Sequence, residues 1–109
     1  MVAGESAAGG GERGIAEAIA GALARAGTRT LFGVPGGGNN LDLIGACREA
    51  GIEFVLGRGE TATAIMAATY GELTGVPGVC VVTRGPGAAS AVNGVAQALL
   101  DRAPMLVIT

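Results

Sequence analysis

The sequence predicts an α/β protein with a three-layer α/β/α architecture, in which helices cover both faces of an open parallel sheet. Three observations support this prediction. Short apolar runs alternate with longer segments in which apolar residues recur every three or four positions, as in alternating strands and helices. The run at 79–83, VCVVT, is apolar without alternation, as a strand is when both of its faces are buried. Glycine-rich turns follow three of the predicted strands, and ligands of such folds bind beyond these strand ends.

The first half of the chain is expected to form two helices and two strands. A helical apolar pattern covers 15–26, and Gly27 ends it. A strand over 30–34, a helix over 41–50 and a strand over 52–56 follow. Each strand is succeeded by a helix, which predicts right-handed crossover connections.

The second half repeats this alternation. A third helix begins at Glu60 and stops at the turn 75–78, and after the apolar strand a fourth helix is expected over 87–100, followed by a last strand over 105–109. The apolar stripe expected on the third helix consists of Ala62, Ile65, Met66, Thr69, Tyr70 and Leu73. The buried row expected on the fourth helix consists of Ala88, Ala91, Val92, Val95 and Leu99.

Composition and length limit what the chain can be. At 109 residues it is one domain at most: a flexible leader over 1–13, rich in Gly, Ala and Ser, and a folded domain over 14–109. A net charge of -2 without a run of basic residues argues against binding to nucleic acid or to a membrane surface. No signal peptide or apolar span is found, so a cytoplasmic location is expected. Cys47 and Cys80 match no metal motif and are expected to be buried and reduced.

Glu60 is the most informative residue, because it lies where a predicted strand passes into a helix. Glycine residues precede it and apolar residues follow it, a setting that could partly withdraw the acid from water, as suits a group that shares a proton. The alternative is a first-turn glutamate that is stabilised by the helix dipole and has no catalytic meaning. Taken by itself, the residue favours that alternative.

Four motifs, taken together in this order and at this spacing, favour the catalytic interpretation of Glu60. They are FGVPGG at 32–37, the Glu60 helix with AATYG at 67–71, TRGPGA at 83–88 and DRAPMLVIT at 101–109. With these motifs the chain from about residue 14 to its end resembles the pyrimidine-binding (Pyr) N-terminal domain of thiamine diphosphate-dependent enzymes, in particular the acetolactate synthase-like decarboxylases and carboligases. Domains of that family have six parallel strands, so the resemblance implies that this chain is a fragment, truncated at its C-terminal end.

The resemblance implies specific roles for the glycine-rich turns and for Glu60. In the family, the glutamate at this position hydrogen-bonds N1′ of the cofactor's aminopyrimidine and promotes its imino tautomer. Glycine also serves ordinary turns, and proline is favoured at the start of a helix, so a purely conformational role stays open for the turn residues. The cofactor-binding residues that the resemblance implies are Pro35, Gly36, Gly37, Glu60, Gly85, Pro86 and Gly87.

Two departures from the family pattern leave substrate and reaction type open. Gly59 stands where many relatives have a histidine before the glutamate, and the chain contains no histidine at all. Arg84 stands where acetolactate synthases usually have serine. Arg84 could pair with a substrate carboxylate or a neighbouring subunit, and an exposed arginine without a role is at least as consistent with the sequence.

The resemblance also implies partners. Family members hold thiamine diphosphate between this domain and a diphosphate-binding domain of another subunit, with Mg²⁺ bridging the phosphates, in homodimers or homotetramers that act on 2-oxo acids as lyases or transferases. The chain alone is expected to be inactive. One alternative is the small subunit of a split thiamine diphosphate decarboxylase. Another is an unrelated α/β nucleotide-binding module, because 85–90 imitates a dinucleotide fingerprint, although Ser90 replaces its third glycine.

Overall fold

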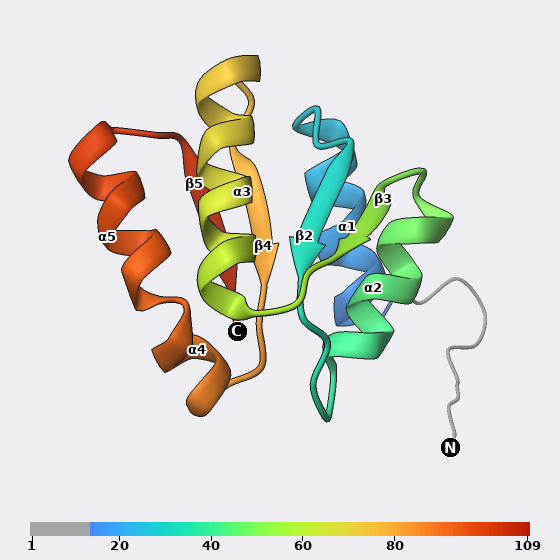
Figure 1. Ribbon diagram of the computed structural model, residues 1–109. Coiled ribbons are helices and arrows are strands. Elements are labelled where there is room, and N and C mark those ends of the chain that lie inside the picture. Colours follow the sequence, from blue (N-terminus) through green and yellow to red (C-terminus); the bar gives the residue numbers. More distant parts are fainter. Residues whose placement is uncertain (1–13) are drawn as a thin grey trace.

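The computed structural model describes residues 14–109, and the predicted leader over 1–13 lies outside the described residues. Helices and strands alternate as the sequence predicts, apart from a helix that is split in two (Figure 1). None of the helices within 14–109 is long and apolar enough to cross a membrane. In chain order the elements are α1 (Ile15–Arg25), β2 (Thr30–Gly33), α2 (Asn40–Glu49), β3 (Glu53–Leu56), α3 (Glu60–Thr74), β4 (Gly78–Val81), α4 (Pro86–Ser90), α5 (Val92–Asp101) and β5 (Met105–Ile108).

The sheet has four strands in the order β3-β2-β4-β5, and every pairing is parallel. The chain therefore passes from β2 to β3 on one side and then returns to place β4 on the other side of β2. Such a reversal of strand order is a topological switch point, where the loops that leave two neighbouring strands diverge and open a crevice at their carboxyl ends. In this chain the diverging loops are those that follow β2 and β4.

Helices cover both faces of the sheet, which confirms the predicted three-layer architecture. α1 and α2 lie on one face, whereas α3, α4 and α5 lie on the other (Figure 1). Side chains that alternate along the strands divide between the two cores. Leu31 and Val81 belong to the core with α1 and α2, while Phe32 and Cys80 belong to the core with α3. The two cysteines are fully buried and unpaired, as expected.

The face of α3 that packs on the sheet differs from the predicted one. Its buried residues are small: Thr63, Ala64, Ala67, Ala68 and Gly71. Of the stripe predicted from large apolar residues, Ile65, Met66 and Leu73 are exposed. The physical reason is the close approach of the helix to β4, since a β-carbon at Gly78 would overlap the carbonyl oxygen of Ala67. Only small side chains fit at that distance.

The predicted fourth helix is two helices, α4 and α5, which meet at Ala91. Ala91 is buried as expected, but Val92, Val95 and Leu99 are exposed, with Leu99 78% accessible. Close packing again explains the difference, because a β-carbon at Gly94 would overlap the side chain of Ala64 on α3. α3 and α5 therefore pack through their small residues, and their larger apolar residues lie on the outside.

Candidate functional site

The loops that follow β2 and β4 touch at the switch point. A β-carbon at Gly36, in the first loop, would overlap the side chain of Thr83, in the second. Thr83 is half-buried and lies two residues after the buried end of β4. Glycine at position 36 is therefore what allows the two loops to come together at the carboxyl ends of the central strands.

Glu60 reaches the same place from a third loop. It is the first residue of α3, it is half-buried, and its N-cap residue Gly59 has extended backbone (φ -165°) and provides no side-chain cap. A β-carbon at Gly87 would lie 3.6 Å from Oε2 of Glu60 and 2.7 Å from Cγ2 of Thr83. Gly36, Glu60, Thr83 and Gly87 thus surround one position, which we call the Glu60 corner.

The remaining predicted site residues flank this corner. Pro35 is exposed, and a β-carbon at Gly37 would meet no atom within 4 Å. Gly85 has a positive φ of 73°, so the turn itself requires glycine there. Pro86 is exposed at the start of α4, a position that favours proline in any protein. For Gly85 and Pro86 the conformational interpretation accounts for the residue type.

Two threonines were missed as members of the site. Thr83 entered the sequence analysis only as the last residue of the predicted strand and the first of a motif, although the end of an apolar strand faces ligands in such folds. Thr63 is fully buried one helical turn after Glu60, and its hydroxyl donates to the backbone oxygens of Gly59 (3.2 Å) and Glu60 (3.0 Å). Nothing in the residue pattern distinguishes Thr63 from a surface threonine.

A buried thiol lies beneath the corner. The Sγ atom of Cys80 is 3.7 Å from the hydroxyl of Thr63 and donates to it. Burial raises the pKa of the Cys80 thiol, the hydrogen bond with Thr63 lowers it, and the nearby charge of Glu60 raises it. Burial also raises the pKa of Cys47. Both thiols are therefore neutral at pH 7 and poor nucleophiles.

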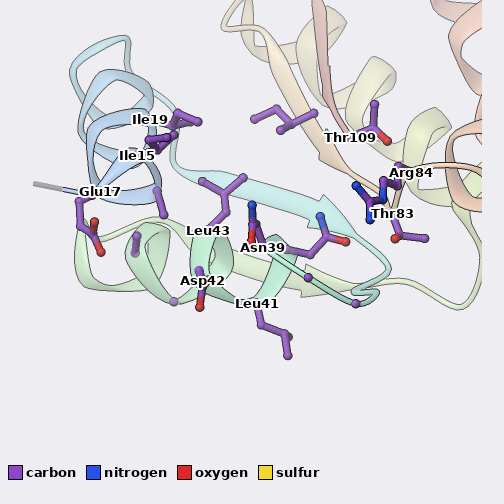
Figure 2. A pocket seen from close by; sticks show the side chains of 18 of the residues that line it. Ile15, Glu17, Ile19, Asn39, Leu41, Asp42, Leu43, Thr83, Arg84 and Thr109 are labelled. Atoms are coloured by element: carbon purple, nitrogen blue, oxygen red, sulfur yellow. The ribbon is translucent and has the colours of Figure 1, made fainter. Parts of the chain in front are cut away.

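A groove of about 1050 Å³ adjoins the corner on the side of α1 and α2 (Figure 2). Thr83 and Arg84 lie at one end of it, Glu17 lies at the other, and Asn39 lies between them. Gly37 also lines the groove, whereas Glu60 does not. Within residues 14–109, no group of three or more His, Cys, Asp or Glu side chains is placed to hold a metal ion.

The chemistry available at the Glu60 corner is narrow. A carboxyl group can accept hydrogen bonds when ionised and donate one when protonated. Gly36 and Gly87 have no side chains, so both loops can pack against Thr83, and the Glu60 carboxyl group lies close to Gly87. Through Glu60, the corner can exchange hydrogen bonds with a polar group of a ligand that enters the crevice.

Comparison with known proteins shows the family to which the chain belongs. A family model described as "Thiamine pyrophosphate enzyme, N-terminal TPP binding domain" matches residues 13–109; thiamine pyrophosphate (TPP) is another name for thiamine diphosphate. The chain is 42% identical over 88 residues, 81% of its length, to the large subunit of acetolactate synthase isozyme 2 from Escherichia coli K12. It is 39% identical over 94 residues, 86% of its length, to the chloroplastic acetolactate synthase of Arabidopsis thaliana.

The matches also show how much of these relatives the chain represents. It covers 16% of the bacterial enzyme and 14% of the plant enzyme, so relative to them it is a fragment. A putative uncharacterized protein from Haemophilus influenzae Rd is 42% identical over 80 residues, which are 73% of this chain and 30% of that protein. The family match over nearly the whole chain excludes the unrelated nucleotide-binding module. The chain belongs to the family of thiamine pyrophosphate enzyme N-terminal TPP binding domains and is related to acetolactate synthase large subunits.

Proposed function

We propose that this chain is the cofactor-activating domain of a thiamine diphosphate-dependent decarboxylase or carboligase, and that Glu60 is its catalytic acid. The observation that carries the proposal is the place of the Glu60 carboxyl group, half-buried against the backbone of Gly87 at the switch point. Ligands of open α/β sheets bind at such points. An acid at this position can act on a ring that enters the crevice.

The residues of the corner fit the aminopyrimidine ring of the cofactor. At Gly36 and Gly87 an added β-carbon would conflict with Thr83, so the two loops keep their close approach only without side chains there, and Glu60 offers a carboxyl oxygen toward a ring nitrogen. When bound, thiamine diphosphate supplies a carbon nucleophile for attack on the carbonyl carbon of a 2-oxo acid.

Each residue of the Glu60 corner and of its flanking loops that the proposal names has a defined task. Glu60 holds a proton at a carboxyl oxygen and shares it with the ring nitrogen, which requires restricted contact with water. Gly36 and Gly87 admit the ring. The flanking residues Pro35, Gly37, Gly85 and Pro86 shape the loops that enclose it.

We further propose that a second domain binds the diphosphate group and Mg²⁺. That domain belongs either to another copy of a longer chain, in a homodimer or homotetramer, or to a separate subunit. The support for a partner is the outer surface of α3 and α5, where Leu73 is 81%, Val92 58% and Leu99 78% exposed. Large exposed apolar side chains on two neighbouring helices favour a contact with a further domain. Without the partner the chain is expected to be inactive.

The small subunit of a split enzyme is the second candidate. The relative from Haemophilus influenzae favours it, because a match of 80 residues amounts to 30% of that protein, so this domain also occurs in proteins shorter than the synthases. A neighbouring reading frame that encodes a separate diphosphate-binding domain would support this candidate over a fragment of one long enzyme.

Calorimetry with thiamine diphosphate and Mg²⁺ tests the proposal. The titration is made on the 109-residue chain, on the chain extended through its downstream reading frame, and on the chain mixed with any separate diphosphate-binding subunit. Binding by the extended or mixed form, much tighter than by the chain alone, is the expected result. Lack of binding by all three forms would contradict the proposed function.

A further inference from the structure

A buried hydrogen-bond network lies directly behind the first turn of α3. Thr63 is 0% exposed, and its hydroxyl donates to the carbonyl oxygens of both Gly59 and Glu60. Its backbone N–H also donates to Gly59, at 3.1 Å. One threonine therefore holds the backbone of the N-cap residue and of the residue that carries the carboxyl group.

This network lies at a helix start that has no side-chain cap. The first N–H groups of a helix have no partners within the helix, and Gly59 provides no side-chain cap for them. Glycine before the helix also leaves the incoming loop free to move. The Thr63 hydroxyl does not pair with these N–H groups. It bonds back to the carbonyl oxygens of Gly59 and Glu60 and so ties the backbone of these two residues to a buried side chain.

The methyl group of Thr63 restricts the incoming loop as well. A β-carbon at Gly57 would overlap Cγ2 of Thr63, so the loop from β3 passes directly over that methyl group. On the other side, the thiol of Cys80 donates to the Thr63 hydroxyl, which connects the turn to the central strand β4. Thr63 thus links the loop, the helix start and the sheet.

We propose that Thr63, with Cys80 as its buried partner, is a positioning residue that fixes the Glu60 carboxyl group at the corner. The proposal rests on the proposed function of Glu60. A helix start that frays moves the carboxyl group relative to the loops after β2 and β4, and a misplacement of about 1 Å at a catalytic group can cost roughly 100-fold in rate.

Three variants of the complete enzyme separate positioning from packing. Thr63→Val keeps the branched shape and the methyl group but loses the hydroxyl. Thr63→Ser keeps the hydroxyl and loses the methyl group. Thr28→Val is the matched control, because Thr28 is the other buried polar residue within 14–109, at 4% exposure, and lies in the turn between α1 and β2.

The first measurement needs no cofactor. Amide hydrogen exchange of the segment 57–64 is compared with that of 67–71 in the same helix, in the enzyme freed of thiamine diphosphate. Thr63→Val is expected to speed exchange in 57–64 by roughly 3- to 10-fold, the effect of one lost hydrogen bond. Thr28→Val is expected to leave the ratio of the two segments unchanged. Thr63→Ser loses only the methyl contact with the loop at Gly57 and is expected to change the ratio less than Thr63→Val does.

The second measurement is steady-state turnover of the cofactor-loaded enzyme. Thr63→Val is expected to lower kcat by roughly 10- to 100-fold with little change in KM for the 2-oxo acid, and Thr63→Ser is expected to retain most of kcat. A Thr63→Val enzyme that matches Thr28→Val in both measurements would overturn the inference. So would a Thr63→Ser enzyme with kcat reduced more than tenfold, a result that decides the question even if Thr63→Val does not fold.

The Glu60→Gln variant separates this inference from the proposed function. If Glu60→Gln leaves turnover intact, the assignment of Glu60 is wrong and the positioning role of Thr63 is wrong with it. If Glu60→Gln abolishes turnover while Thr63→Val behaves as the control does, only the role of Thr63 is wrong.

Discussion

The carboxyl group of Glu60 lies beside the backbone of Gly87, at a point where a β-carbon on residue 87 would be 3.6 Å from Oε2. The two residues begin different helices, α3 and α4, on loops that follow different strands. Their proximity depends on the strand order, which brings the loop after β4 to the switch point where the β3-α3 loop also ends. The catalytic proposal depends on this pairing of an acid with a position that has no side chain.

Gly87→Ala tests the need for an open corner. The added β-carbon would lie 2.7 Å from Cγ2 of Thr83 and 3.6 Å from Oε2 of Glu60, so the threonine must shift and the space beside the Glu60 carboxyl group becomes smaller. We expect the complete enzyme to bind thiamine diphosphate at least about tenfold more weakly, the cost of a modest steric conflict. Calorimetry checks this, with Gly45→Ala as control, because a β-carbon at Gly45 meets no atom within 4 Å. Equal affinity of the two variants would show that the corner is not filled by the cofactor.

Gly78→Ala tests the close contact between α3 and β4. Its β-carbon would overlap the backbone carbonyl oxygen of Ala67, which cannot rotate away as a side chain can. We expect the free energy of unfolding to fall by about 3 kcal/mol. Gly45→Ala, within α2, is expected to raise it by about 0.5–1 kcal/mol, because alanine loses less backbone entropy than glycine on folding. Urea unfolding of both variants measures the difference, and equal stabilities would contradict the packing described here.

Arg84→Ser tests whether the groove that adjoins the corner binds the substrate. Arg84 is exposed and lies at the end of the groove nearest Thr83 (Figure 2). If its guanidinium group pairs with the substrate carboxylate, the KM for 2-oxo acids should rise roughly tenfold without a change in affinity for the cofactor. Arg48→Ser, in the last turn of α2, serves as control. An unchanged KM would mean that Arg84 is an exposed residue without a role in substrate binding.

Because a buried thiol has a raised pKa, we expect the free energy of unfolding to fall in alkaline solution. Burial raises the pKa of Cys47 above the ordinary thiol value of 9.0, so the unfolded chain releases this proton at a lower pH than the folded chain does. The stabilisation is fully present below pH 9.0 and is lost as the pH rises toward the folded-state pKa. The chain has no lysine, so few other groups change charge in this range.

The measurement is the free energy of unfolding from urea titrations at about pH 8 and about pH 10. Wild type should lose more stability between these two conditions than Cys47→Ala, which lacks the thiol. Equal losses would show that the Cys47 thiol titrates alike in the folded and unfolded chain.

Much of the fold could be predicted from the sequence, because it depends on local signals. Glycine residues mark the strand-to-helix turns, and the unbroken apolar run that contains Cys80 and Val81 identifies a strand buried on both faces. Glu60 was recognisable as the first residue of a helix, and α3 begins there in the structure. Such features depend on neighbours in the chain and need no knowledge of tertiary packing.

The packing faces of α3 and α5 could not be predicted in the same way. Apolar periodicity gives the most weight to large side chains such as Leu73 and Leu99, and these are exposed. The faces that pack consist of alanine and glycine, because their contacts are backbone to backbone, as at Gly78 and Ala67. Thr63 was missed for a related reason, since its role depends on a strand that lies 17 residues further along the chain.

The most direct test of the central claim is the exchange rate of the C2 proton of bound thiamine diphosphate in the complete enzyme. Wild type is compared with Glu60→Gln and with Glu72→Gln, an exposed residue further along the same helix. The account predicts that exchange slows by roughly 100- to 10,000-fold in Glu60→Gln, the range for loss of an acid-base group, and is unchanged in Glu72→Gln. Exchange at the wild-type rate in Glu60→Gln, with the cofactor still bound, would contradict the assignment of Glu60 as the acid that activates the cofactor.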